Sequence, residues 1–287
     1  MSRPAVARKA PGKTARGRTR RARPRAASTV GRSRRHWHRA YLRASLAARV
    51  VVGGALLLLF ALAVNWIYQV VCKPSELLFP VSGALYKTPP ETWQQYGPLF
   101  RRYSTRVMTP ELLAAIAQVE SSGNPVARTY WRWSWTTQPF EIYRPASSAV
   151  GMYQITDGTF AEARRYCVHN HTVVTDGSWT ALRSCWFNTL YARVIPGDAV
   201  ELTAAYLDRA VTTALARNRL RSAPLHQQQQ LAAVIHLCGA AAGDGYVRRG
   251  FRVPAGERCG DHDVRTYLAR IHSMSGEFER LEDVGSG

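Results

Sequence analysis

One stretch of this chain decides its fold, and it reads Leu112-Leu113-Ala114-Ala115-Ile116-Ala117-Gln118-Val119-Glu120-Ser121-Ser122-Gly123-Asn124-Pro125. Thr109 and Pro110 precede it and supply helix start signals, an N-cap hydroxyl followed by a proline in the first turn. The closing Gly-Asn-Pro run is a stop signal. Glu120 lies one turn after Ile116, beside the apolar stripe. The pattern predicts a helix over residues 109–120 that ends on a glutamate next to the core.

A carboxyl group in that position is expected to have an altered acidity. Burial removes water from the charged form, so the pKa of Glu120 is expected to rise until the group can donate a proton near neutral pH. The alternative is a solvated glutamate at a frayed helix end, with no chemical role.

A second motif, Gly151-Met152-Tyr153-Gln154-Ile155-Thr156, reads as a turn. Together with Glu120-Ser121-Ser122-Gly123-Asn124-Pro125 it resembles the soluble lytic transglycosylase (SLT) family, relatives of goose-type lysozyme. That family carries a Glu-Ser-x-x-Asn-Pro helix end and a Gly-Leu-Met-Gln-Ile turn. Met152 and Tyr153 stand where the family has Leu and Met. The likeness covers roughly residues 103–275.

Two later segments extend the likeness. Asp263-Val264-Arg265-Thr266-Tyr267-Leu268 resembles the family's closing Glu-Thr-Arg-x-Tyr-Val segment. The family's Tyr-Asn-Ala-Gly falls on His236-Leu237-Cys238-Gly239, where the asparagine is absent. The resemblance implies a mainly α, lysozyme-like catalytic domain, α+β at most. The alternation of apolar and polar residues that is typical of strands is scarce in this sequence. This agrees with a mainly α domain that has at most a small hairpin.

The resemblance also implies a reaction on peptidoglycan glycan strands. Glu120 would be the single catalytic acid and base, cleaving the β-1,4 bond between N-acetylmuramic acid and N-acetylglucosamine. The muramic acid would leave as its 1,6-anhydro form, so the enzyme would be a lyase that needs no metal and no cofactor. The residues expected to bind substrate are Ser121, Gly151, Met152, Tyr153, Gln154, Tyr267 and His236.

Five of these residues also have a structural interpretation. Ser121 can cap the helix end, and the Gln154 amide can stabilise the turn. Tyr153 and Tyr267 can be ordinary core or structural tyrosines. His236 reads more readily as a buried histidine beside a Cys238 bridge than as a substitute for the family's tyrosine.

Two other functions fit the same sequence. A lysozyme-type hydrolase would need a second carboxylate, and Glu141, Asp157 and Glu162 are candidates that no spacing selects. A non-catalytic glycan-binding scaffold is the alternative from a different class. Such a scaffold has no need of a carboxyl group at an apolar helix end.

The basic charge is concentrated near the N-terminus. The chain has 287 residues and a net charge of +20, and residues 1–49 hold 16 of its 39 Lys and Arg and no acid. The segment has too little apolar sequence to fold alone, which is typical of disorder. Its only aromatic residues are Trp37 and Tyr41, which disfavours a nucleic-acid partner and favours attraction to a membrane surface.

Residues 50–71 are apolar and long enough to cross a bilayer, at about 1.5 Å of rise per residue. Trp66 and Tyr68 stand where an interfacial aromatic belt is expected. The positive-inside rule predicts a single-pass protein of the cytoplasmic membrane, with a cytoplasmic N-terminus and the rest periplasmic or otherwise outside. The competing interpretation is a signal peptide cut after Ala63.

The cysteines agree with export. Cys167 is expected to pair with Cys185, and Cys238 with Cys259, because each pair brackets a local loop. The chain contains no Cys-x-x-Cys motif, which argues against a zinc site. Cys72 is left over at the membrane edge.

The remaining chain divides into two parts. Prolines are dense in residues 72–102, which predicts a semi-extended linker, and residues 103–287 are long enough for one domain. Helical patterns recur at 109–120, 157–166, 198–217, 225–238 and 262–274.

An aromatic insertion at 126–146 separates the two motifs. It is expected either beside the substrate cleft or in a small satellite core, with a membrane-dipping loop as a third interpretation.

A membrane anchor with a cytoplasmic arm suggests restrained, local cutting of the wall. An envelope-spanning secretion or conjugation apparatus is the partner that such an arrangement suggests.

Overall fold

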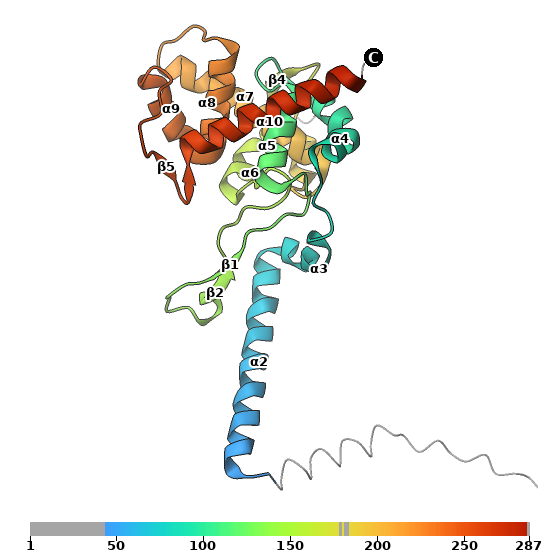
Figure 1. Ribbon diagram of the computed structural model, residues 1–287, viewed down its shortest axis with the longest axis vertical. Coiled ribbons are helices and arrows are strands. Elements are labelled where there is room, and N and C mark those ends of the chain that lie inside the picture. Colours follow the sequence, from blue (N-terminus) through green and yellow to red (C-terminus); the bar gives the residue numbers. More distant parts are fainter. Residues whose placement is uncertain (1–43, 178–179, 181–183, 286–287) are drawn as a thin grey trace, which may run out of the picture. The chain divides into compact units, whose positions relative to one another are not determined.

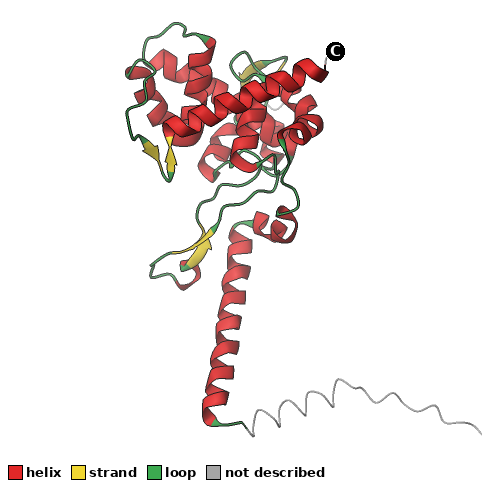
Figure 2. Ribbon diagram, viewed as in Figure 1, coloured by secondary structure: helices red, strands yellow, loops and turns green. Residues whose placement is uncertain are grey.

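The computed structural model describes residues 44–177, 180 and 184–285, in two compact units, Met1–Ala61 and Leu62–Gly287. Helices dominate the second unit, and its strands are short (Figure 2). This confirms the predicted mainly α class. Most of the basic segment 1–49, including Trp37, lies outside the described residues.

One apolar helix, α2, runs from Leu46 to Cys72. It starts four residues before the predicted span and has a mean hydropathy of 2.4 over its most apolar window. Its 27 residues rise about 40 Å, which exceeds the apolar thickness of a bilayer. Among the described residues it is the one helix of this kind, compatible with a membrane anchor or with a signal sequence.

The segment after α2 is folded, which corrects the expectation of a semi-extended linker over residues 72–102. It contains the short helices η1 (Pro74–Leu78) and α3 (Phe79–Ser82), and then α4 (Pro89–Tyr103). The prolines that suggested an extended chain mostly begin helices, where a missing N–H costs nothing. Thr88 and Glu91 complete a capping box at the start of α4.

The core of the second unit surrounds α5 (Pro110–Ser121). Leu113, Ala114, Ile116 and Ala117 are all fully buried, so this helix has no solvated face along its middle. In Figure 1, α10 (Val264–Gly285) crosses α5 and reaches α4, and these helices pack on one another. A helix from each end of the domain therefore encloses α5.

The remaining helices form the other side of the domain. They are α6 (Asp157–Ala163), η3 (Trp186–Leu190), α7 (Pro196–Arg217), α8 (Leu225–Cys238) and α9 (Ala240–Arg248). The predicted helix over 225–238 matches α8 at both ends, whereas α9 was not predicted. Gly239 separates α8 from α9 with a φ of +83°, a conformation that other residues rarely adopt.

Three antiparallel hairpins complete the fold, where the sequence predicted at most one. They pair β1 (Trp131–Trp133) with β2 (Tyr143–Pro145), β3 (Tyr166–His169) with β4 (Thr172–Thr175), and β5 (Arg258–Cys259) with β6 (His262–Asp263). A short 3-10 turn, η2 (Pro139–Glu141), lies between β1 and β2.

Two disulfides brace the last two hairpins. Cys167 of β3 is joined to Cys185, and Cys238 at the end of α8 is joined to Cys259 of β5. Both are the expected pairs. Cys72 is free and exposed.

Candidate active site

Glu120 lies in the last turn of α5, where the helix stops abruptly. Thr109 caps the start of the helix by accepting a hydrogen bond from the Leu112 amide. Ser122 ends it in the left-handed conformation, with a φ of 51°. The carboxyl group is thereby held at the edge of the core, with 18% of its side chain exposed.

Two side chains from distant helices meet this carboxyl group. The Tyr267 hydroxyl, on α10, donates a hydrogen bond of 2.7 Å to Glu120 Oε1. His236 Nε2, on α8, lies 3.5 Å from the same oxygen. Tyr267 is itself buried, so its hydroxyl has a fixed partner. The structure thus brings together three of the residues that the sequence selected.

These neighbours reverse the expected shift of the Glu120 pKa. Burial is the largest single influence and raises it, but the hydrogen bond and charge of His236, the hydrogen bond of Tyr267 and the charge of His262 all lower it. Together they outweigh burial, and the pKa lies below its usual value. The expectation of a raised pKa is therefore wrong for the free site, because an ionised carboxylate has favourable partners there.

Tyr267 shows the opposite effect. Burial and the adjacent Glu120 carboxylate raise the pKa of the Tyr267 hydroxyl well above its ordinary value. It therefore remains a hydrogen-bond donor at any physiological pH.

A cavity of about 210 Å³ is lined by one of the three residues, His236. His236 links the two features, because it lines the cavity and also contacts Glu120. Gln154 and Tyr206 contribute polar groups to the lining. The other lining residues are Ile155, Thr156, Thr159, Ala163, Leu202, Thr203, Leu207, Ile235, Leu237 and Gly239.

Ser121 does not contact the Glu120 carboxylate in this structure. Its buried hydroxyl donates to the backbone carbonyl of Met152 at 2.8 Å and to that of Ala117 at 3.1 Å. Its role is to tie the end of α5 to the 151–154 turn. The two sequence motifs are thereby joined by a hydrogen bond through a side chain that had been expected to bind substrate.

The turn itself is held by close backbone packing. Gly151 has a φ of 84°, and a Cβ there would collide with the Arg193 carbonyl oxygen. Gln154 also has a positive φ, 48°, and its Nε2 donates to the carbonyls of Gly151 at 2.9 Å and Ala127 at 3.2 Å. The turn-stabilising role of the amide is therefore present. Because both bonds use the nitrogen, the amide oxygen is left for a ligand in the adjoining cavity.

Met152 and Tyr153 belong to the core, which corrects the expectation that they touch substrate. Both side chains are fully buried. The Tyr153 hydroxyl has no hydrogen-bond partner among the described residues, and burial raises its pKa well above the ordinary value. The motif alone cannot reveal this, because a turn presents side chains to either side.

Sequence reasoning missed His262, which begins β6. The charge of His262 lowers the pKa of Glu120. The family motif stops at the neighbouring Asp263, so only the disulfide loop ending at Cys259 marked this region. His262 is part of the β5–β6 hairpin, and this hairpin brings it to the site.

The other candidate acids have partners elsewhere. Asp157 pairs with Arg193 at 2.7 Å, and Glu141 pairs with Arg144 at 3.0 Å. Glu162 lines a separate hollow beside Tyr166. Among the described residues, none of these acids forms a hydrogen bond or ion pair with Glu120.

Comparison with known proteins identifies one family. Residues 99–223 match the family model described as the transglycosylase SLT domain. No curated protein matches the chain. The matched region contains Glu120 and Gln154, but it ends before His236 and Tyr267, the two side chains that meet the Glu120 carboxylate.

Proposed function

We propose a single-carboxylate mechanism, and its premise is that residues 99–223 match the transglycosylase SLT domain, which indicates cleavage of peptidoglycan glycan strands. Glu120 cleaves the β-1,4 bond between N-acetylmuramic acid and N-acetylglucosamine. The product ends in 1,6-anhydro-N-acetylmuramic acid. The reaction is a lyase reaction, since no water enters the products.

The observation that carries this proposal is the arrangement around Glu120. One carboxyl group contacts a tyrosine hydroxyl and an imidazole, and the same imidazole lines a cavity that has an amide on its wall. The proposal gives both proton transfers to this one group. Tyr267 and His236 hold its orientation between the two steps.

The proton transfers balance without water. Protonated Glu120 donates its proton to the glycosidic oxygen, and the N-acetylglucosamine leaves as a free alcohol. The acetamido group of the N-acetylmuramic acid stabilises the positive charge that develops at C1. The Glu120 carboxylate then removes the proton of the C6 hydroxyl, and that oxygen closes on C1. Glu120 ends the cycle in its protonated form.

The low pKa of Glu120 in the free site requires a source of protonation. A glycan strand that covers the site removes more water from the carboxyl group, and burial is already the strongest influence in favour of its neutral form. The hydrogen bond and charge of His236 oppose this change, because they lower the pKa of Glu120. We therefore assign His236 a positioning role that sets the pKa of Glu120.

Gln154 supports substrate binding. Its amide nitrogen is used by the turn, so its oxygen accepts a hydrogen bond from a sugar hydroxyl or an acetamido N–H. The left-handed backbone at this residue directs the side chain back across the turn. Tyr267 touches Glu120 directly, and its hydroxyl stabilises the carboxylate formed after the first proton transfer.

Product analysis tests the reaction. The full-length protein in detergent is incubated with purified peptidoglycan, and the released muropeptides are separated and weighed. Anhydro products, lighter than hydrolysed ones by one water, are expected, and Glu120→Gln should release almost none. Reducing-end products would instead indicate a lysozyme-type hydrolase. Glycan binding without any release would leave a non-catalytic scaffold.

The location follows from the same chain. The apolar helix α2, the basic residues before it and the two disulfides after it support a single-pass protein of the cytoplasmic membrane, with its domain on the outer side. A reporter that works only in the cytoplasm should be silent when fused after Gly287. A processed N-terminus at Val64 would contradict the anchor.

Such an anchored enzyme suits local opening of the wall within an envelope-spanning secretion or conjugation apparatus. Crosslinking followed by co-purification from the native host tests this part, and recovery of the chain alone would contradict it.

A further inference from the structure

The aromatic insertion forms a hairpin that is fastened to the end of α2. This aromatic hairpin, residues 130–145, lies along the last turns of the helix. Asn65 Nδ2 donates to the Tyr143 carbonyl at 2.8 Å, and Gln69 Nε2 donates to the Phe140 carbonyl at 2.7 Å. The rings of Tyr68 and Phe140 stack with their centroids 5.2 Å apart. Two polar side chains of an otherwise apolar helix are thus used to hold the hairpin.

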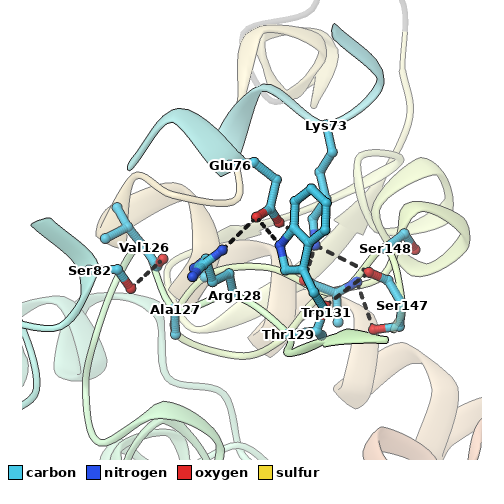
Figure 3. A network of polar contacts seen from close by, with 12 residues as sticks. Lys73, Glu76, Ser82, Val126, Ala127, Arg128, Thr129, Trp131, Ser147 and Ser148 are labelled. Carbon is cyan, nitrogen blue, oxygen red and sulfur yellow. Dashed lines mark hydrogen bonds and ion pairs between the residues drawn. The ribbon is translucent and has the colours of Figure 1, made fainter. Parts of the chain in front are cut away.

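A buried ionic network fixes the base of the same hairpin (Figure 3). Glu76, in η1, is fully buried and accepts hydrogen bonds of 2.9 Å from Arg128 and from the Trp131 indole. Lys73 lies 3.4 Å from Glu76 and also donates to the carbonyls of Ser147 and Ala149. Both arms of the insertion are therefore attached to the residues that directly follow α2.

The two faces of the hairpin differ in chemistry. Trp131 and Trp133 share one face with Tyr143, with ring centroids 5.2 Å and 4.7 Å from it. Arg132 and Arg144 are paired across the strands and point to the other face. An aromatic face backed by arginines matches the water–lipid boundary, where apolar rings enter the chains and cations meet phosphates.

Much of this aromatic surface has no protein cover. Trp133 is 67% exposed and Trp135 is fully exposed, and Tyr130, Phe140 and Ile142 are exposed as well. An apolar hollow of about 310 Å³ opens between helix and hairpin, lined by Leu62, Asn65, Trp66, Arg128, Trp131 and Tyr143. Exposed apolar patches of this kind mark interaction sites.

We propose that the aromatic hairpin is a second membrane contact, inserted into the outer-leaflet interface beside the last turns of α2. The proposal rests on the anchor assigned to α2 above. If α2 crosses the bilayer, Trp66 and Tyr68 lie at its outer interface, and the hairpin is bonded to this same stretch of helix. Its exposed tryptophans then lie among lipid chains and headgroups, with the phosphate groups facing Arg132, while Arg144 is paired with Glu141.

A glycan-binding role fits the positions of these residues less well. None of the residues that line the cavity beside Glu120 comes from residues 126–146. The base of the insertion meets the site at Ala127, whose carbonyl accepts hydrogen bonds from the Gly151 amide at 2.7 Å and from Gln154 Nε2 at 3.2 Å. The hairpin therefore holds the Gln154 turn at a set distance from the bilayer, which confines cutting to glycan strands close to the membrane.

Tryptophan fluorescence of the full-length protein tests the proposal. The chain is reconstituted into nanodiscs of phosphatidylethanolamine and phosphatidylglycerol whose upper acyl chains are either brominated or unmodified. The emission of Trp133 and Trp135 is obtained as the difference between the unaltered chain and the double variant Trp133→Phe/Trp135→Phe. This emission should be largely quenched by bromine. The emission of Trp186, obtained in the same way from the control variant Trp186→Phe, should not be quenched. This exposed tryptophan lies in η3, outside the hairpin.

A third variant, Trp66→Phe, separates the hairpin from the anchor. Quenching of the Trp66 emission without quenching of the Trp133 and Trp135 emission would overturn the hairpin proposal and leave the anchor intact. Unquenched Trp66 emission would overturn both. If added glycan strands, rather than bromine, change the emission of Trp133 and Trp135, the hairpin is a glycan-binding element and the proposal is wrong. None of these readouts depends on catalysis, so they are independent of the reaction assigned to Glu120.

Discussion

Two sheltered glutamates in this protein have opposite surroundings. Glu76 is fully buried and has Lys73, Arg128 and an indole N–H as partners, all on segments next to α2. Glu120 is slightly exposed and has an imidazole and a phenol as partners. The Glu76 setting pairs a carboxylate with two cationic side chains and fastens two segments. The Glu120 setting lowers the pKa of a carboxyl group that stays partly open to solvent.

The largest expected effect comes from Glu120→Gln. Glutamine keeps the shape and a hydrogen-bonding group, but it cannot deliver a proton. Turnover on purified peptidoglycan should fall by about 10²–10⁴-fold or more, since one group performs both transfers, while glycan binding persists. Full activity of this variant would remove Glu120 from the mechanism.

The same variant should alter how stability depends on pH. Because its neighbours lower the folded-state pKa of Glu120, the ionised group stabilises the fold above its unfolded pKa, and that contribution is lost as pH falls through the folded pKa. Glu120→Gln should lack this loss on acidification. Thermal unfolding of both proteins at several pH values measures this. If the variant loses as much stability on acidification as the unaltered protein, the Glu120 carboxylate gains no stability from its partners.

Glu76→Gln should affect stability and leave the chemistry intact. It leaves two cations in a sheltered site without their anion, so the unfolding free energy should fall by about 3 kcal/mol, the lower part of the range for broken buried pairs because Arg128 is partly exposed. Chemical denaturation in detergent measures the change. Glu282→Gln is the matched control, because its pair with Arg101 is exposed and should contribute under about 1 kcal/mol. An equal loss of unfolding free energy in the two variants would show that the buried network of Glu76 contributes no more than an exposed ion pair.

His236→Gln should shift the pH profile. The first step needs protonated Glu120, so kcat/KM should fall as pH rises through the Glu120 pKa of the free enzyme. The hydrogen bond and charge of His236 lower this pKa, and their removal should raise it, which moves the alkaline limb to higher pH. His226→Gln, exposed on the same helix, should leave the limb unchanged. A collapse of turnover at every pH would instead give His236 a direct chemical role.

The smallest effect is expected for Tyr267→Phe. It removes one hydrogen bond from the Glu120 carboxylate, so the alkaline limb should move in the same direction as in His236→Gln but less far. Tyr153→Phe is the control, because it deletes a buried hydroxyl without a partner among the described residues and should change neither profile nor stability adversely. If both variants behave alike, the Tyr267 hydroxyl has only a packing role.

Local patterns predicted much of the fold because their causes are local. The start and stop signals around α5, the period of α8 and the spacing of the cysteine pairs each depend on residues close in sequence. Residues 72–102 were misread for the same reason. Prolines at helix starts look like extended-chain prolines until the core that Trp93 and Phe100 join is known.

By itself, the sequence determined that an apolar helix ends on Glu120, that a turn follows it and that an apolar segment precedes the domain. The tertiary structure alone decided that Ser121 ties the two motifs together, that Tyr153 is buried and that the hairpin lies along α2. It also decided the direction of the Glu120 pKa shift. The physical reason is that helix start and stop signals act between residues close in sequence, whereas burial and the pKa of a carboxyl group depend on which groups distant segments bring within a few ångströms. For Glu120 these groups lie on segments more than a hundred residues away.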